Sequence, residues 1–208
     1  MPDFKMGNPA QTVLSQSGTA RPTWGTGVPK GSVIEQFMSP CDGSVITVQS
    51  GTYTVGNVTA KQDLTSSHAD VTGSVIDYTP PTGTQTVLYS FTFMLSWVDG
   101  TQPHNIGHYK LFLDNDSGTA TEVTNFRTTL ASQQYHGAKY SLNWAFHIGG
   151  SDNDATGRRD TWTSARTIKI QAREYSSGNQ VKLFETKHWD GASSDQFSQP
   201  LIGITALA

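Results

Sequence analysis

The sequence predicts an all-β protein, an antiparallel, jelly-roll-like β-sandwich preceded by an extended N-terminal arm. Three observations support this fold class. One long stretch, TVLYSFTFMLSWV at 86–98, alternates between two kinds of residue along its whole length. About ten shorter alternating segments follow one another at near-regular spacing, separated by turn residues. No window shows the apolar i, i+3, i+4, i+7 pattern of a capped helix.

The long stretch is expected to form the central strand, roughly 40 Å long at about 3.3 Å per residue. Alternation with period 2 assigns its residues to two faces. The apolar and aromatic face comprises Val87, Tyr89, Phe91, Phe93, Leu95 and Trp97. We expect it to pack, inside one sandwich, against the apolar face of a second strong segment, made of Tyr140, Leu142, Trp144 and Phe146. The other face carries small hydroxylated residues that let another sheet approach closely, which makes Ser90, Thr92 and Ser96 the candidate subunit-contact face.

The other expected strands follow the same alternation. In chain order they are 32–38, 44–49, 52–57, 58–64, 74–79, 108–114, 138–148, 167–175, 180–186 and 201–207. The last of these, LIGITAL, is so apolar that we expect it to be buried in a sheet. The pattern is weak at 123–137, where we expect an irregular excursion, and 149–165 and 187–199 are expected to be polar loops.

Composition limits the classes of function. The chain has 208 residues, of which 15% are charged, and a formal net charge of −3, which favours neither a nucleic-acid partner nor an anionic membrane surface. Cys41 is the single cysteine, so neither an intrachain disulfide nor a thiolate metal cluster is expected. There is no run of about 18 apolar residues and no apolar secretory core at the N-terminus. We therefore expect a protein made in the cytosol without membrane insertion.

Residues 1–30 differ from the rest and are interpreted as an attachment arm, followed by one β domain at 31–208. The arm shows no sustained hydrophobic period of 2 or 3.6 residues. Its large apolar residues are scattered along an otherwise polar segment; they are Phe4, Met6, Val13, Leu14 and Trp24. An extended segment cannot bury such residues by itself, so they are the candidate attachment residues and require a groove on another protein or on a neighbouring subunit.

Motifs of catalysis or cofactor binding are missing from the sequence, so we expect no enzyme activity, no cofactor and no metal site. His104 and His108 lie about 13 Å apart along a strand, too far to share a metal ion. The Asp-rich segments 114–118 and 152–154 are interpreted as turns, because no glutamate follows where a calcium loop needs one. The enzymatic alternative is a small polysaccharide depolymerase that uses paired carboxylates; its candidate acids are Glu122, Glu174 and Glu185.

Two tryptophans, Trp162 and Trp189, lie in polar loops, where exposing an aromatic ring is costly. They are candidate receptor or interface aromatics that would stack on a sugar or fill a subunit contact; the alternative is packing of the loops onto the core.

Two segments resemble structural proteins of tailed bacteriophages. TVLSQSGTARPTWGTGVPKGSVIEQF is similar to a linker of these proteins, through Val13, Leu14, Ser15, Gly18, Pro22, Thr23, Trp24 and Gly25. HADVTGSVIDYTPPTGTQTVLYSFTFMLSW is similar to β-rich C-terminal domains of phage fibres, especially from marine phages. The shared steps are Asp70-Val71-Thr72-Gly73 and Thr79-Pro80, and the closing LIGITALA resembles the last strand of such domains.

This resemblance implies a jelly-roll-like homotrimer that forms a virion appendage, a short fibre, spike or head fibre. The arm would bind other virion proteins of the capsid or tail, and the distal loops would bind a host surface, with its glycans as candidate ligands. It also implies assembly in the host cytoplasm. The sequence lacks heptads and a shaft, which leaves a capsid decoration protein that stabilises the phage head as the alternative.

Overall fold

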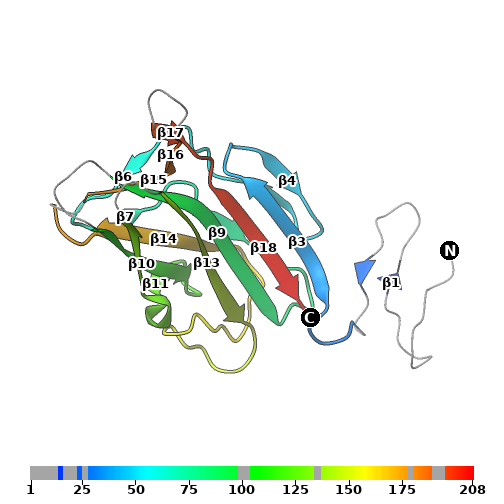
Figure 1. Cartoon of the computed structure of the whole chain (residues 1–208). Helices are drawn as coiled ribbons and strands as arrows, with labels where there is room; N and C mark the ends of the chain where they lie inside the picture. Colours follow the sequence, from blue (N-terminus) through cyan, green and yellow to red (C-terminus); the bar gives the residue numbers. More distant parts are fainter. Residues whose placement is uncertain are drawn as a thin grey trace.

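The computed structural model describes residues 14–15, 23–24, 28–97, 104–133, 137–177, 180–188 and 195–208. Two curved antiparallel sheets lie face to face, and the start of the β domain and the C-terminus lie at one end of the sandwich (Figure 1). Within the described residues, no helix is long and apolar enough to cross a membrane.

The first sheet has four long strands side by side in the order β3-β18-β9-β13. Their bounds are β3 Val33–Pro40, β18 Leu201–Leu207, β9 Thr86–Trp97 and β13 Ala138–His147. The far end of β9 also pairs with β15 (Val181–Leu183), which pairs with β6 (Gln62–Asp63). The apolar C-terminal strand is buried at the centre of this sheet, as predicted.

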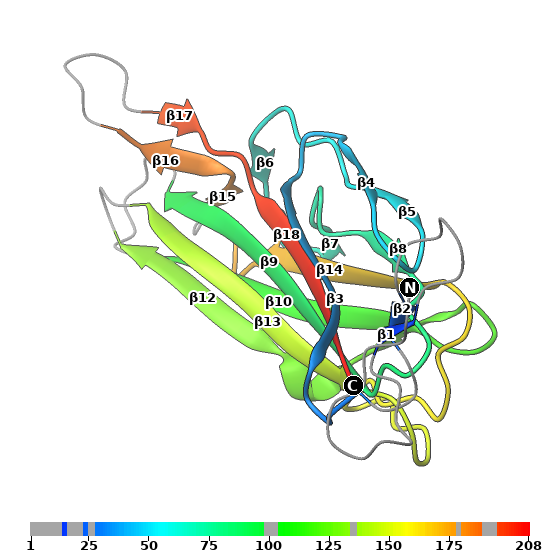
Figure 2. The ribbon, with the colours of Figure 1, turned by 90° about the vertical axis from the view of Figure 1, so that its right-hand side faces the viewer.

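The second sheet is built on β10 (His104–Asp114) and β14 (Arg166–Glu174). On the free side of β10 lie β12 (Thr128–Gln133) and β11 (Ala120–Glu122), and on the free side of β14 lie β8 (Ile76–Tyr78) and β7 (Ala69–Asp70). The main strands alternate between the two sheets along the chain, except that the consecutive strands β10 and β12 lie in the same sheet. In chain order these strands are β3, β8, β9, β10, β12, β13, β14 and β18. That is the path of a jelly roll, and the predicted fold class is confirmed (Figure 2).

The remaining elements are short. They are the hairpins β1 (Leu14–Ser15) with β2 (Thr23–Trp24), β4 (Val45–Thr47) with β5 (Thr52–Thr54), and β16 (Glu185–Lys187) with β17 (Asp195–Phe197), and one 3₁₀ turn, η1 (Thr124–Phe126).

The core lies between the two sheets. The inward residues of β9 from Val87 to Leu95 are at most 2% exposed. Across the core they meet the inward face of β10 and β14; the rings of Phe93 and Tyr109 are 5.7 Å apart. The prediction that the apolar faces of β9 and β13 pack together inside one sandwich is confirmed, with the two strands as neighbours in one sheet. Strand β13 is hydrogen-bonded beside β9, with Leu142 opposite Phe91. The sequence did not reveal this pairing, because alternation shows which residues share a face and not which strand is the neighbour.

Two expectations are corrected by the structure. The segment expected to be irregular contains β12, which pairs with β10 from Tyr109 to His104. Strand β10 also starts four residues earlier than the alternation indicated, at His104. Both stretches lack a clear apolar face, so their strand state depends on the mutual backbone pairing of β10 and β12.

A buried carboxylate fixes the start of β3. Glu35 is 6% exposed and accepts hydrogen bonds from the Ser50 backbone N–H (2.7 Å), the Ser50 hydroxyl (2.7 Å) and the Tyr78 hydroxyl (2.8 Å). Burial and the neighbouring carboxylate raise the pKa of the Tyr78 hydroxyl. These bonds tie β3 to β8 and to the β4–β5 turn, and they satisfy a charge that would otherwise be costly to bury.

Candidate functional site

The two sheets differ in what their outer faces carry. The outer face of the second sheet is charged: Lys110 pairs with Glu122 (3.1 Å) and Lys169 with Asp70 (3.1 Å). Arg173 lies on the same face, opposite His108 in the register. This is the usual composition of a solvated sheet surface.

The outer face of the first sheet has a different composition. Directly opposite residues of neighbouring strands share a face, so the registers give its outward positions row by row. They are Pro40, Leu201, Thr92 and Ser141; Met38, Gly203, Ser90 and Asn143; Gln36, Thr205, Leu88 and Ala145; and Val33, Leu207, Thr86 and His147. None of these sixteen positions carries Asp, Glu, Lys or Arg, whereas the next row of the same face, Met94 opposite Lys139, carries one lysine. We call the sixteen positions the uncharged face.

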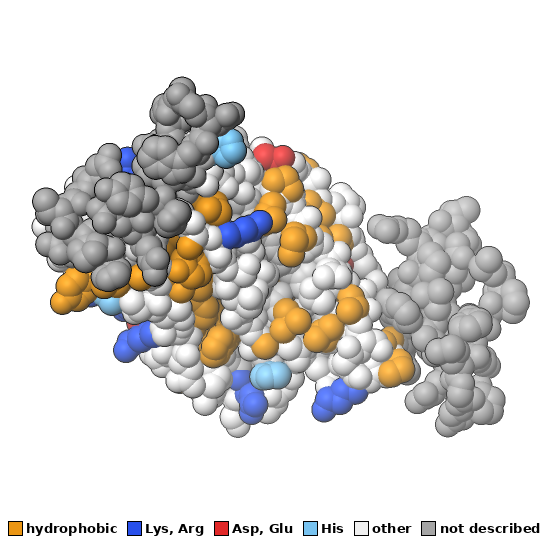
Figure 3. Space-filling model, viewed as in Figure 1, with side chains coloured by type: hydrophobic (Ala, Val, Ile, Leu, Met, Phe, Trp, Pro, Cys, Tyr) orange, Lys and Arg blue, Asp and Glu red, His pale blue; other side chains and the backbone are white. Residues whose placement is uncertain are grey.

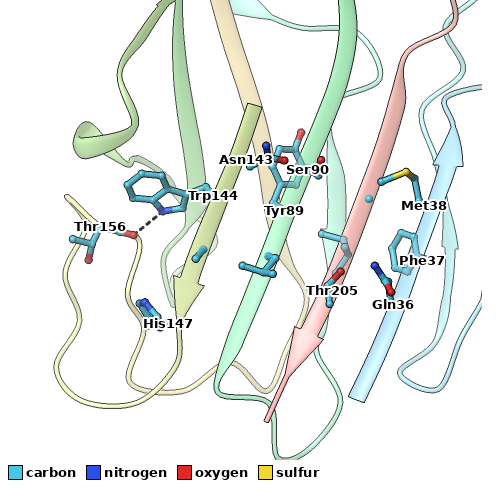
Figure 4. A pocket seen from close by; sticks show the side chains of 14 residues that line it. Gln36, Phe37, Met38, Tyr89, Ser90, Asn143, Trp144, His147, Thr156 and Thr205 are labelled. Carbon is cyan, nitrogen blue, oxygen red and sulfur yellow. Dashed lines mark hydrogen bonds between the residues drawn. The ribbon is translucent and has the colours of Figure 1, made fainter. Parts of the chain in front are cut away.

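The middle of the uncharged face is hollowed into an open groove of about 660 Å³. Figure 3 shows hydrophobic side chains gathered on this side of the molecule, and Figure 4 shows Met38 on β3 and Ser90 and Asn143 on β9 and β13 around the groove. Met38 is 61% exposed and Leu88 37% exposed. Gly203 forms the floor, where an added Cβ would lie 3.3 Å from the Met38 side chain.

Polar side chains surround the apolar centre. His147 Nδ1 lies 3.2 Å from Thr86 Oγ1 at the lower edge, and the Trp144 indole N–H donates to the Thr156 carbonyl (3.0 Å) at the outer edge of β13 (Figure 4). An apolar centre with an uncharged polar rim is the composition of a protein–protein contact rather than that of a catalytic site.

The predicted subunit-contact residues divide between two environments. Ser90 and Thr92 lie on the uncharged face, where Thr92 Oγ1 is 2.7 Å from Ser141 Oγ. Ser96 does not belong to the open face. It is fully buried, and its hydroxyl donates to Glu185 Oε1 (3.0 Å), because β16 lies over this end of β9. Its placement in the contact face is therefore corrected.

Of the two tryptophans in polar loops, Trp162 lies among the described residues and is buried. Trp162 is 4% exposed, its indole N–H donates to the Tyr78 carbonyl (3.0 Å), and its ring lies 5.9 Å edge-to-face from Phe146. Presentation of Trp162 to a receptor or subunit is therefore corrected in favour of packing onto the core. Trp189 lies outside the described residues, as do Phe4, Met6 and Val13 of the arm.

The acidic turns that the sequence placed in separate loops come together. Carboxylate oxygens of Asp116, Asp152 and Asp160 lie within 4.8 Å of one another, all on exposed residues. Such oxygens are ligands for hard cations, but Asp116 also bonds the buried Arg166 guanidinium, which lowers the pKa of its carboxyl. Spacing along the chain could not reveal this cluster, because the β10–β11 turn and the β13–β14 loop meet only in the folded sandwich.

The three glutamates considered for polysaccharide cleavage have separate surroundings. Glu122 is held by Arg127 (2.7 Å) and Lys110, and its pKa is lowered by them. Glu185 is fully buried beside Lys61 (2.8 Å). Glu174 is buried, and desolvation raises the pKa of its carboxyl.

No protein-family model and no curated protein matches the chain. Among solved structures, it is similar to infectious bursal disease virus Gx strain, with 8% identity over 100% of this chain and 46% of that one and a TM-score of 0.37. It is also similar to the VP2 subviral particle of the same virus, with 9% identity over 85% of this chain and 42% of that one and a TM-score of 0.35. The chain spans about half the length of these structures. At TM-scores below 0.5 the overlap establishes neither a common fold nor a common function.

Proposed function

We propose that the chain is a structural subunit of a virus particle, a homotrimeric surface appendage anchored by its N-terminal arm and facing the host surface with its distal loops. The observation that carries the proposal is the uncharged face beside a charged opposite face on one jelly-roll sandwich. The exposed apolar side chains at the centre of this face, Met38 and Leu88, are suited to a protein–protein contact. The resemblance of 11–98 to tailed-phage structural proteins supports a virion as the assembly that supplies it.

The direction of the chain agrees with anchoring at one end. The Gly31 N–H donates to the Ala208 carbonyl, so the arm leaves the sandwich beside the C-terminus. Strands β16 and β17 lie at the opposite end (Figures 1 and 2). A subunit held by its arm would therefore present the β16–β17 end outward.

The test is localisation on intact particles with and without the arm. We expect gold-labelled antibody to bind the particles and deletion of 1–30 to abolish incorporation while leaving a soluble β domain. Label at the tail identifies a short fibre or spike; label on the head identifies a head fibre or capsid decoration protein. Normal incorporation of the deleted form would refute anchoring by the arm, and a stable monomer in sedimentation would refute the trimer.

A further inference from the structure

A second pocket, of about 260 Å³, lies away from the uncharged face, between the last residue of β14, the start of β15 and the residues at and after β6. Strands β6 and β15 lie at the same end of the sandwich as β16 and β17 (Figures 1 and 2). Two backbone hydrogen bonds join the pocket walls: the Leu64 N–H donates to the Val181 carbonyl (2.9 Å), and the Glu174 N–H donates to the Thr65 carbonyl (2.8 Å). The walls are therefore fixed by the fold.

The Glu174 side chain lines this pocket with a carboxylate that is only partly hydrogen-bonded. The residue is 5% exposed, and its carboxylate accepts the Val181 backbone N–H. Its Oε2 atom is buried and has no hydrogen-bond partner among the described residues. Desolvation and the nearby Asp63 carboxylate both raise the pKa of Glu174. A buried carboxylate oxygen without a donor is costly, and a positively charged donor would offset that cost.

The cations of the surrounding strands are directed elsewhere. Lys182 lies opposite Asp63 in the β6–β15 register and between two buried neighbours, so its side chain is on the outer side of β15. Arg173 donates to two backbone carbonyls, and Lys61 pairs with Glu185 (2.8 Å). The residues between β9 and β17 that lie outside the described ranges include no lysine or arginine. A cation for this pocket would therefore come from a ligand.

The size and the lining of the pocket favour a small ammonium compound over a bare metal ion. The volume of 260 Å³ equals that of roughly eight water molecules at about 30 Å³ each. A calcium ion takes six or more oxygen ligands, and the acidic triad that the described structure brings together lies elsewhere, at Asp116, Asp152 and Asp160. An ammonium group has three N–H donors and no acceptor, which suits a carboxylate oxygen beside the hydroxyl-bearing residues Thr65 and Ser66.

We propose that this pocket binds a small ligand through a primary ammonium group, which donates to Glu174 Oε2. Thr65, Ser66 and Gln180 line the rest of the pocket and would contact the body of the ligand. The inference does not depend on the proposed function. It adds a ligand site at the end of the sandwich opposite the arm.

Titration of the full-length protein, followed by ¹H–¹⁵N nuclear magnetic resonance, tests the inference. The probes are ethanolamine and glucosamine, and each is compared with an uncharged counterpart, ethylene glycol and N-acetylglucosamine. Glu174→Gln keeps the shape of the side chain and removes its charge. The matched control is Glu122→Gln, which removes the same charge from the outer face of the second sheet, where Glu122 pairs with Lys110 and Arg127.

Both amines are expected to shift the amide signals of Thr65, Ser66 and Val181 in a saturable way, and the uncharged compounds are not. Glu174→Gln should weaken amine binding about tenfold or more, because it removes a charge-assisted hydrogen bond, and Glu122→Gln should leave it unchanged. Tighter binding of glucosamine than of ethanolamine would identify an amino sugar as the ligand, and equal binding would identify a pocket that selects the ammonium group alone.

Three results would overturn the inference. They are equal shifts from an amine and its uncharged counterpart, undiminished amine binding by a folded Glu174→Gln variant, and preferential saturation of the same signals by calcium ions. A cooperative thermal melt verifies that Glu174→Gln is folded. The comparison of charged with uncharged probes uses the wild-type protein, so it decides the question even if the variant does not fold.

Discussion

Gly73 sits in a turn whose backbone and surroundings both exclude a side chain. Its φ is +82°, and an added Cβ would lie 2.5 Å from Val58 Cγ2 and 3.1 Å from Cys41 Cβ. Replacing Gly73 with alanine costs about 1–2 kcal/mol for the left-handed backbone and about 1–3 kcal/mol for overpacking. We therefore expect Gly73→Ala to lower the free energy of unfolding by about 2–5 kcal/mol.

Gly118 provides the matched control. Its φ is +71°, and nothing lies within 4 Å of an added Cβ, so Gly118→Ala incurs the backbone cost alone. Both variants lose the same chain entropy in the unfolded state, so their difference isolates the clash in the core. Equilibrium urea unfolding of the two variants and the wild type measures it. Equal losses at Gly73 and Gly118, within about 0.5 kcal/mol, would refute the packing argument.

Three further predictions concern buried polar groups. Burial raises the pKa of the Glu174 carboxyl in the folded protein. The stability that the protonated carboxyl contributes is therefore lost as the pH rises from the unfolded-state pKa through the higher folded-state pKa. Glu174→Gln should raise the melting temperature at pH 7 and not at pH 4, and a pH-independent difference would contradict this. Lys61→Met removes the 2.8 Å ion pair between Lys61 and the fully buried Glu185. We expect a loss of about 2 kcal/mol in urea unfolding, below the roughly 3–5 kcal/mol of a fully buried pair because Lys61 is 34% exposed. No loss would show that this pair is not stabilising. Trp162→Phe removes the hydrogen bond to the Tyr78 carbonyl and part of the ring volume. We expect it to lower the free energy of unfolding by about 1–3 kcal/mol, measured by thermal melts. An unchanged melting temperature would mean that the loop packs equally well without the indole.

The long alternating segments were predictable because a strand's two faces follow from local geometry. The inward residues of β9, and the buried residues Ile202 and Ile204 of the C-terminal strand, are apolar at every second position. The edge strand β12 and the early start of β10 were not predictable, because their residues alternate weakly and the backbone bonds between the two strands hold them in place. The sequence left open whether Trp162 packs onto the core for a related reason: a polar loop gives no local sign that it folds back onto Tyr78.

By itself the sequence determined the all-β class and the two faces of the central strand, since each depends on residues adjacent in the chain. Only the tertiary structure decided that β13 lies beside β9 and that Glu35 is buried with three donors. It alone also brought Met38, Ser90 and Gly203 into one row of an uncharged face. These residues come from strands far apart in the sequence, and the charge pattern of a surface exists only after hydrogen-bond registers have placed such strands side by side.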